Sequence, residues 1–172
     1  MSAYSRALLV FAHATVRTDH RWETFCFGTR LTRVTRALDA ASLDTALQNV
    51  AAEVHDWEGG TRIGASLKTF LDRWGHPGLA RGAVVVICSD GLDTGDSTLL
   101  REQMARLSRL AEVVVWLNPL KADPRYEPVA RGMATALPYV DVFASGHNLA
   151  SLQELGAGLR LRPTRQRRTE TL

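Results

Sequence analysis

Asp90 and Thr61 are the two side chains of this sequence best placed to bind a ligand. Asp90 comes two residues after the apolar run 83–88, whose β-branched residues predict a strand buried on both faces within a parallel sheet. Open α/β sheets bind their ligands at the carboxyl ends of such strands, so Asp90 is a candidate binding residue. The alternative is that Asp90 and Gly91 only form a turn, because this dipeptide is common in turns.

Thr61 ends the tight turn Gly59-Gly60-Thr61, directly before a predicted helix. Its hydroxyl and the Asp90 carboxylate are both oxygen ligands, which suit a hard cation such as Mg²⁺ or Mn²⁺. We therefore predict that Thr61 and Asp90 approach each other at the carboxyl edge of the sheet. Capping of the following helix is the other role open to Thr61.

The elements that would position these residues alternate between helix and strand. Apolar periodicity predicts helices over residues 4–16, 43–54 (with Ser42 as N-cap), 63–74, around 100–110, 126–136 and 149–159. Strands are predicted over residues 21–27, 83–88, 113–117 and 139–143, with a short edge strand over 32–35. This order predicts an α/β fold in which right-handed crossovers cover both faces of the sheet.

The composition fits a single globular domain. The chain has 172 residues, of which 45% are hydrophobic, and no apolar run approaches the length of about 20 residues that crosses a bilayer. Cys26 and Cys88 fall in predicted strands without a CxxC pattern, which is typical of reduced, structural thiols in a cytoplasmic protein.

The net charge of +3 owes much to the arginines at the end of the chain. Five of these lie close together: Arg160, Arg162, Arg165, Arg167 and Arg168. Such a tail could touch nucleic acid, but it lacks interleaved aromatic residues. We predict that residues 159–172 are a disordered, solvated tail and that the protein has no nucleic-acid partner.

Four stretches together resemble a von Willebrand factor A (VWA) domain, and specifically the CoxE-like branch of bacterial VWA proteins. They are Thr-Phe-Cys-Phe-Gly-Thr-Arg-Leu-Thr-Arg-Val-Thr (24–35), Gly-Gly-Thr-Arg-Ile-Gly (59–64), Ser-Asp-Gly (89–91) and Val-Trp-Leu-Asn-Pro (115–119). The resemblance covers nearly the whole chain, to about residue 158. It implies a doubly wound, mostly parallel, Rossmann-like sheet with helices on both faces.

The resemblance also implies a function. VWA domains carry a metal-ion-dependent adhesion site, to which Thr61 and Asp90 would contribute the matching threonine and second aspartate. Many family members work beside MoxR-type AAA+ ATPases. CoxE-like proteins are associated with maturation of molybdenum-containing carbon monoxide dehydrogenase and its relatives. The expected partners are therefore such an ATPase and a target metalloenzyme.

One part of the family pattern is missing. The motif Asp-x-Ser-x-Ser should end a central first strand, which would pair with strand 21–27 on one side and strand 83–88 on the other, but this chain begins after that point. We therefore expect an N-terminally truncated VWA-like domain over residues 1–158, and a natural polypeptide that continues upstream. With three ligands missing, Mg²⁺ or Mn²⁺ should bind weakly or not at all.

The leading interpretation is a non-catalytic protein-interaction module. The alternative is a phosphoryl-transfer enzyme that uses Asp90 at its strand end as the nucleophile. That chemistry calls for a second aspartate two residues later, where this chain has Leu92, and for a lysine in a matching loop. Lys121 is available, although its Asn-Pro-Leu-Lys context is more typical of a turn.

Overall fold

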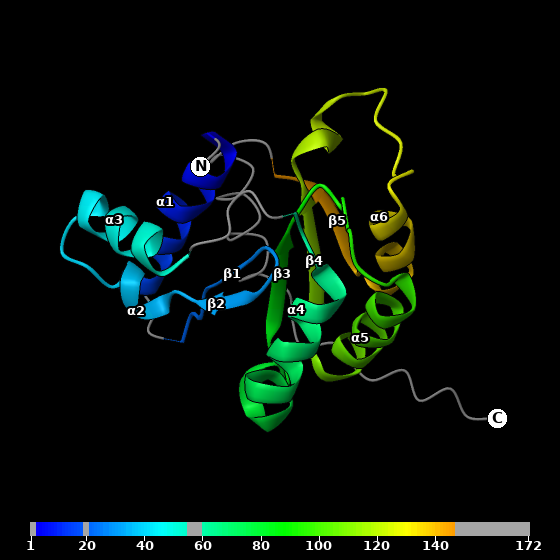
Figure 1. The fold of residues 1–172 in the computed structure, drawn as a ribbon, viewed down its shortest axis with the longest axis horizontal. Coiled ribbons are helices and arrows are strands. Elements are labelled where there is room, and N and C mark those ends of the chain that lie inside the picture. The colour runs from blue at the N-terminus through cyan, green and yellow to red at the C-terminus, as the bar shows by residue number, and fades with distance from the viewer. Residues whose placement is uncertain (1–2, 19–20, 55–59, 147–172) are drawn as a thin grey trace.

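The computed structural model describes residues 3–18, 21–54 and 60–146 and shows a mixed α/β fold (Figure 1). The helices are α1 (Ala3–Thr18), α2 (Thr35–Leu38), α3 (Leu43–Glu53), α4 (Ile63–Phe70), the π-helical η1 (Leu71–Leu79), α5 (Ser97–Leu110), the 3₁₀ turn η2 (Pro119–Ala122), α6 (Arg131–Ala136) and the 3₁₀ turn η3 (Leu137–Tyr139). The strands are β1 (Phe25–Phe27), β2 (Leu31–Arg33), β3 (Val84–Cys88), β4 (Val113–Asn118) and β5 (Val142–Ser145).

The larger sheet is parallel, in the order β3-β4-β5. All six residues of β4 are buried, as its continuous apolar sequence predicts. The prediction that β3 is buried on both faces is right only in part: Val85 and Ile87 pack into one core and Val86 and Cys88 into another, but Val84 at the start of the strand is 42% exposed. Among the described residues β3 is an edge strand. An apolar run shows what a strand can bury, but it does not show whether a second strand lies beside it.

Helices cover both faces of this sheet, which confirms the doubly wound, Rossmann-like arrangement. On one face, α4, α5 and α6 enclose Ile87, Val114 and Trp116 in one hydrophobic cluster. On the other face, Leu8 and Phe11 of α1 pack against residues of β3, β4 and β5. Alternate residues of β4 therefore belong to different cores, as the period-two geometry of a strand requires.

A further core lies beside the sheet. Leu9 and Val16 of α1 pack with Leu38 of α2, Leu47 of α3 and neighbouring buried residues. Figure 1 shows α1, α2 and α3 gathered on one side of the molecule. One apolar face of α1 (Leu9 and Val16) therefore packs into this core, and the other (Leu8 and Phe11) packs against the sheet, so that α1 joins the two.

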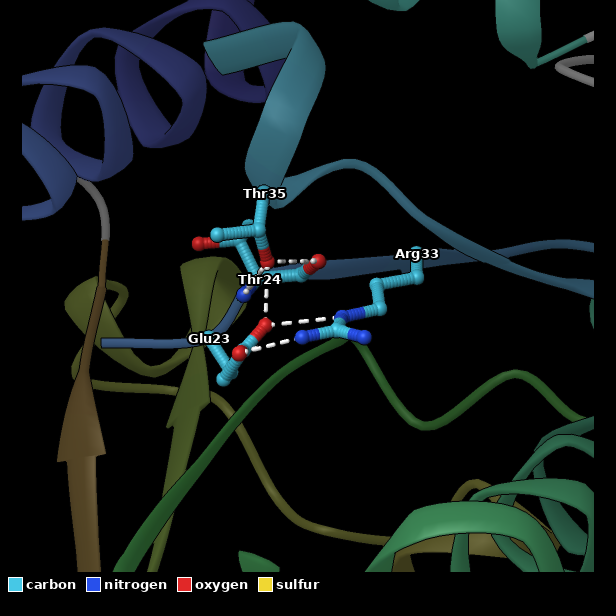
Figure 2. Close-up of polar contacts among 4 residues, drawn as sticks. All are labelled: Glu23, Thr24, Arg33 and Thr35. Atoms are coloured by element: carbon cyan, nitrogen blue, oxygen red, sulfur yellow. Dashed lines mark hydrogen bonds and ion pairs between the residues drawn. The ribbon is translucent and has the colours of Figure 1, made fainter. Parts of the chain in front are cut away.

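Strands β1 and β2 form a separate antiparallel hairpin. Figure 2 shows how polar contacts fix its base: Glu23 accepts hydrogen bonds from Arg33 and from the Thr35 hydroxyl, and Thr24 N–H donates to that hydroxyl (3.0 Å). Phe25 packs edge-on against Phe70 of α4 (ring centroids 5.2 Å apart). The hairpin is therefore attached to α2 and α4 through side chains.

The hairpin and the parallel sheet do not pair with each other within the described residues. Within the described residues, β1 pairs only with β2, and β3 pairs only with β4. Ala83 and Ser89 hydrogen-bond toward β4, so alternation directs the main-chain groups of Val84, Val86 and Cys88 to the outer edge of β3.

Several element boundaries differ from those predicted. Strand 21–27 is reduced to Phe25–Phe27, and the 32–35 strand shifts to Leu31–Arg33 because Thr35 begins α2. The predicted strand 139–143 shifts to Val142–Ser145. The helix predicted over 126–136 begins only at Arg131.

Helix predictions in the first half of the chain fare better. Helix α1 is confirmed, and so is α3, where the Ser42 hydroxyl accepts a hydrogen bond from Thr45 N–H. The helix over 63–74 continues as the π-helical segment η1 to Leu79. The predicted helix 149–159, the boundary at residue 158 and the tail 159–172 lie outside the described residues. No helix in the described part of the chain is long and apolar enough to span a membrane.

Candidate metal-binding and interaction site

Thr61 lies beside the loop that follows β3. Its carbonyl oxygen accepts two hydrogen bonds from Thr94, one from the main-chain N–H (2.9 Å) and one from the hydroxyl (3.0 Å). Figure 1 shows that the loop after β3 and the segment after β4 leave the sheet at the same edge. The structure therefore brings Thr61 to the carboxyl edge of the sheet, next to the loop in which Asp90 lies.

Asp93 holds these two loops together. Its Oδ1 accepts hydrogen bonds from Ile63 N–H (2.9 Å) and from Gly95 N–H (3.1 Å). The residue before α4, Arg62, makes no side-chain capping bond, so Asp93 supplies the cap from thirty residues away. The sequence did not identify Asp93 as a site residue, because no motif near Asp93 indicates that it caps a helix thirty residues away. The capping alternative for Thr61 is not what the structure shows.

Asp90 forms a turn at the end of β3. Its Oδ1 accepts a hydrogen bond from Leu92 N–H (3.0 Å), and the Ser89 hydroxyl accepts one from Gly91 N–H (3.1 Å). Gly91 has φ = 82°, a backbone conformation that favours glycine. The turn-forming role of Asp90 is therefore real, and it leaves the second carboxylate oxygen available for another partner.

The turn is also packed tightly against α6. A Cβ added to Gly132 would lie 2.4 Å from the carbonyl oxygen of Gly91, and one added to Gly91 would lie 2.7 Å from the Met133 Cβ. Two glycines therefore allow α6 to press on the turn that carries Asp90. Any side chain at Gly132 would displace this turn.

Asn118, at the end of β4, is the buried centre of the site. It is fully buried, and its amide donates hydrogen bonds to the Asp90 carbonyl (3.1 Å) and the Tyr126 hydroxyl (2.8 Å). Its Oδ1 accepts from Leu120 N–H (2.8 Å). The sequence offered one signal for it, an asparagine between a buried strand and a proline, which is typical of a side-chain-stabilised turn.

Tyr126 borders the same cluster. Burial raises the pKa of its phenol, the hydrogen bond from Asn118 opposes this increase, and the negative charge of Asp90 adds to it. The phenol is therefore neutral at pH 7 and keeps its proton. Its oxygen accepts a hydrogen bond from the Asn118 amide, so its hydroxyl proton can be donated to another acceptor.

The oxygen atoms of Thr61 and Asp90 are of the type that a hard cation binds, but two side chains are too few to hold it alone. Thr61 and Asp90 are half-buried, and within the described part of the chain the Thr61 hydroxyl and Asp90 Oδ2 make no hydrogen bond. The same part holds no group of three His, Cys, Asp or Glu side chains that could bind a metal ion. A cation held by Thr61 and Asp90 would therefore take most of its ligands from water or from a partner protein. Their joint use as metal ligands stays a prediction.

The geometry does not favour the phosphoryl-transfer alternative. The Lys121 ammonium donates to the Phe143 carbonyl of β5 and lies 4.4 Å from the centre of the Phe143 ring. Both of these contacts of the Lys121 ammonium are therefore with Phe143 of β5, and not with Asp90. Leu92, at the position where that chemistry needs a second acid, is 63% exposed.

Comparison with known protein families shows to which family this chain belongs. The sequence matches the family described as "VWA domain containing CoxE-like protein" over residues 1–152. The chain belongs to this VWA CoxE-like family. Comparisons with curated proteins and with solved structures found no match.

Proposed function

We propose that this VWA CoxE-like protein is a cytoplasmic, non-catalytic interaction module that acts with a MoxR-type AAA+ ATPase in the maturation of a metalloenzyme, such as a molybdenum-containing carbon monoxide dehydrogenase. The match to the family over residues 1–152 carries this proposal. The cross-linked loops at the carboxyl edge support it, since they form a fixed surface around Asp90 and Thr61.

A divalent cation would link this surface to its partner. Thr61 and Asp90 would hold Mg²⁺ or Mn²⁺, which supplies positive charge to attract an acidic side chain of the partner. Asp93 and Asn118 would keep the two loops in place, and the Tyr126 hydroxyl would donate a hydrogen bond toward the incoming carboxylate. With only two protein side chains as ligands, the chain alone should bind the cation weakly or not at all, and the partner would complete the site.

Binding to the purified ATPase tests the proposal. Biolayer interferometry would compare the wild-type chain with Asp90→Asn, against a MoxR-type AAA+ ATPase from the same genome, with ATP or ADP and with Mn²⁺ or EDTA. Asp44→Asn, on the exposed first turn of α3, is the matched control. We expect Mn²⁺-dependent binding that Asp90→Asn weakens and Asp44→Asn preserves. An ATPase that binds neither form would contradict the proposal.

The cation itself can be tested separately. Electron paramagnetic resonance of free Mn²⁺ should show binding to the chain alone that is millimolar or weaker, and weaker still for Asp90→Asn. Tight stoichiometric binding that does not depend on Asp90 would contradict the assigned ligands.

A further inference from the structure

Large apolar side chains are exposed on the loops around Asp90. Among the large apolar residues that are exposed in the described part of the chain, Leu92 (63%), Leu120 (50%) and Val129 (78%) are the most exposed, and all three follow β3 or β4. Single exposed apolar side chains are common on protein surfaces, but several of them gathered at one place mark an interaction surface.

Leu92 and Leu120 occupy equivalent positions after two neighbouring strands. Strands β3 and β4 pair directly, and each is followed by a turn that an Asp or Asn side chain holds. Leu92 N–H donates to Asp90 Oδ1 (3.0 Å), and Leu120 N–H donates to Asn118 Oδ1 (2.8 Å). The Asn118 amide also donates to the Asp90 carbonyl (3.1 Å), which joins the two turns. The two leucines are therefore carried by adjacent, connected turns, one of which bears the Asp90 carboxylate.

Val129 belongs to the same edge of the sheet. It lies in the chain between Tyr126, whose hydroxyl accepts a hydrogen bond from Asn118, and Gly132, which packs against the carbonyl oxygen of Gly91. Contacts on both sides of Val129 thus attach its segment to the turns after β3 and β4. The backbone that carries the three apolar side chains is already fixed, so a partner would lose little free energy in ordering it.

We infer that Leu92, Leu120 and Val129 are the apolar contacts for a partner protein segment in which an acidic residue is flanked by large apolar residues. This inference rests on the proposed function, in which the partner's carboxylate reaches a cation at Asp90 and Thr61. Apolar anchors of this kind carry much of the binding free energy of protein interfaces. In an extended segment, residues i, i+2 and i+4 line one face, so the pattern apolar-x-acid-x-apolar presents all three side chains together.

A lipid surface fits this edge less well than a protein partner. The loop over residues 89–96 carries Asp90, Asp93 and Asp96 and no basic residue, so anionic lipids would repel it. Asp93 and Asp96 accept hydrogen bonds from main-chain N–H groups at the beginnings of α4 and α5. A cation at Asp90 would then be the positive charge that an acidic residue of the partner meets.

Peptide titrations followed by NMR of the leucine methyl groups test this inference, on the full chain in excess Mg²⁺. The probe is the peptide Leu-Ser-Asp-Ser-Leu with both ends capped, and capped Ala-Ser-Asp-Ser-Ala and Leu-Ser-Asn-Ser-Leu are the comparison peptides. We expect the probe to bind about tenfold more tightly than the alanine peptide, because its leucines bury additional apolar surface.

The double variant Leu92→Ser/Leu120→Ser should lose this tenfold preference and keep the weaker affinity for the alanine peptide. Leu79→Ser is the matched control, because Leu79 is also exposed (38%) but lies at the end of η1, before β3 begins. It should leave both affinities unchanged. All of these changes remove exposed side chains, so the variants should melt like the wild type.

The outcomes separate this inference from the proposed function. Equal affinities for the leucine and alanine peptides, or unchanged affinities in the double variant, would overturn the inference, and the proposed cation would still be supported if Asp90→Asn weakened binding. Equal affinities for the Asp and Asn peptides would contradict the cation, whereas a loss in the double variant would still support the apolar contacts. Absence of binding by the leucine peptide, leucine-dependent self-association of the chain, or binding to anionic vesicles in place of the peptide would also overturn the inference.

Discussion

The Asn118 amide donates a hydrogen bond to the main-chain carbonyl of Asp90 at 3.1 Å. A buried residue at the end of β4 thereby holds the turn at the end of β3. The position of the Asp90 carboxylate therefore depends on Asn118 as much as on its own strand.

Replacing Asn118 with alanine should strongly destabilise the protein. The change leaves the Asp90 carbonyl, the Tyr126 hydroxyl and Leu120 N–H without their partner in a buried region, so we expect the free energy of unfolding to fall by about 2–4 kcal/mol. Urea denaturation followed by circular dichroism measures this loss. The control Asn49→Ala, on an exposed face of α3, should change it little. A similar loss in both variants would count against the role of Asn118.

Removing the Asp93 carboxylate should loosen the junction between the loops. Asp93→Ala should lower the free energy of unfolding by about 1–2 kcal/mol and speed hydrogen exchange at Ile63 N–H, which loses its acceptor. Asp96→Ala is the matched control, because Asp96 caps α5 through Thr98 N–H. It should cost about 1 kcal/mol without affecting Ile63. Unchanged exchange at Ile63 in Asp93→Ala would contradict the bond.

The contribution of the hairpin base to stability should depend on pH. The hydrogen bond from Arg33 and that from Thr35 hold the pKa of Glu23 below its ordinary value of 4.5, and burial only partly opposes them. A lowered pKa contributes stability that is present above pH 4.5 and is lost as the pH falls through the folded-state value.

Glu23→Gln should therefore be less stable than the wild type at pH 7, by up to about 1 kcal/mol. The difference should shrink as the pH falls below 4.5. Thermal melts between pH 3 and pH 7 measure it, with Glu53→Gln at the exposed end of α3 as control. A difference that grows in acid would have the wrong sign.

The Cys88 thiol should react slowly in the folded protein. Burial raises its pKa to about 12, so only about one thiol in ten thousand is ionised at pH 8. In a Cys26→Ser background, iodoacetamide should modify Cys88 orders of magnitude more slowly in buffer than in denaturing urea. Mass spectrometry gives both rates, and equal rates would show that Cys88 is accessible.

The elements predicted best are those whose signals are local. The continuous apolar run of β4, the stripes of α1 and the Ser42 cap of α3 each depend on residues close together in the chain. Asp90 was placed correctly at the end of a strand for the same reason. The family resemblance then ordered these elements into a doubly wound fold.

The features that sequence reasoning missed depend on contacts between distant segments. Asp93 caps a helix that begins thirty residues earlier, and Asn118 reaches a turn 28 residues away. The exposure of Val84 likewise reflects what lies beside β3, which the apolar run cannot encode. Hydrogen bonds and burial of this kind follow from the assembled fold.

The double packing of α1 has a consequence for biosynthesis. Leu8 and Phe11 find their partners on β4 only after Val113 to Leu117 have been made, about 100 residues later. At a synthesis rate of about 5–20 residues per second, this separation corresponds to roughly 5–20 s on the ribosome. Leu9 and Val16 can meet α2 and α3 much sooner. The sheet-facing stripe of α1 therefore stays without its partners on β4 until that strand has been made.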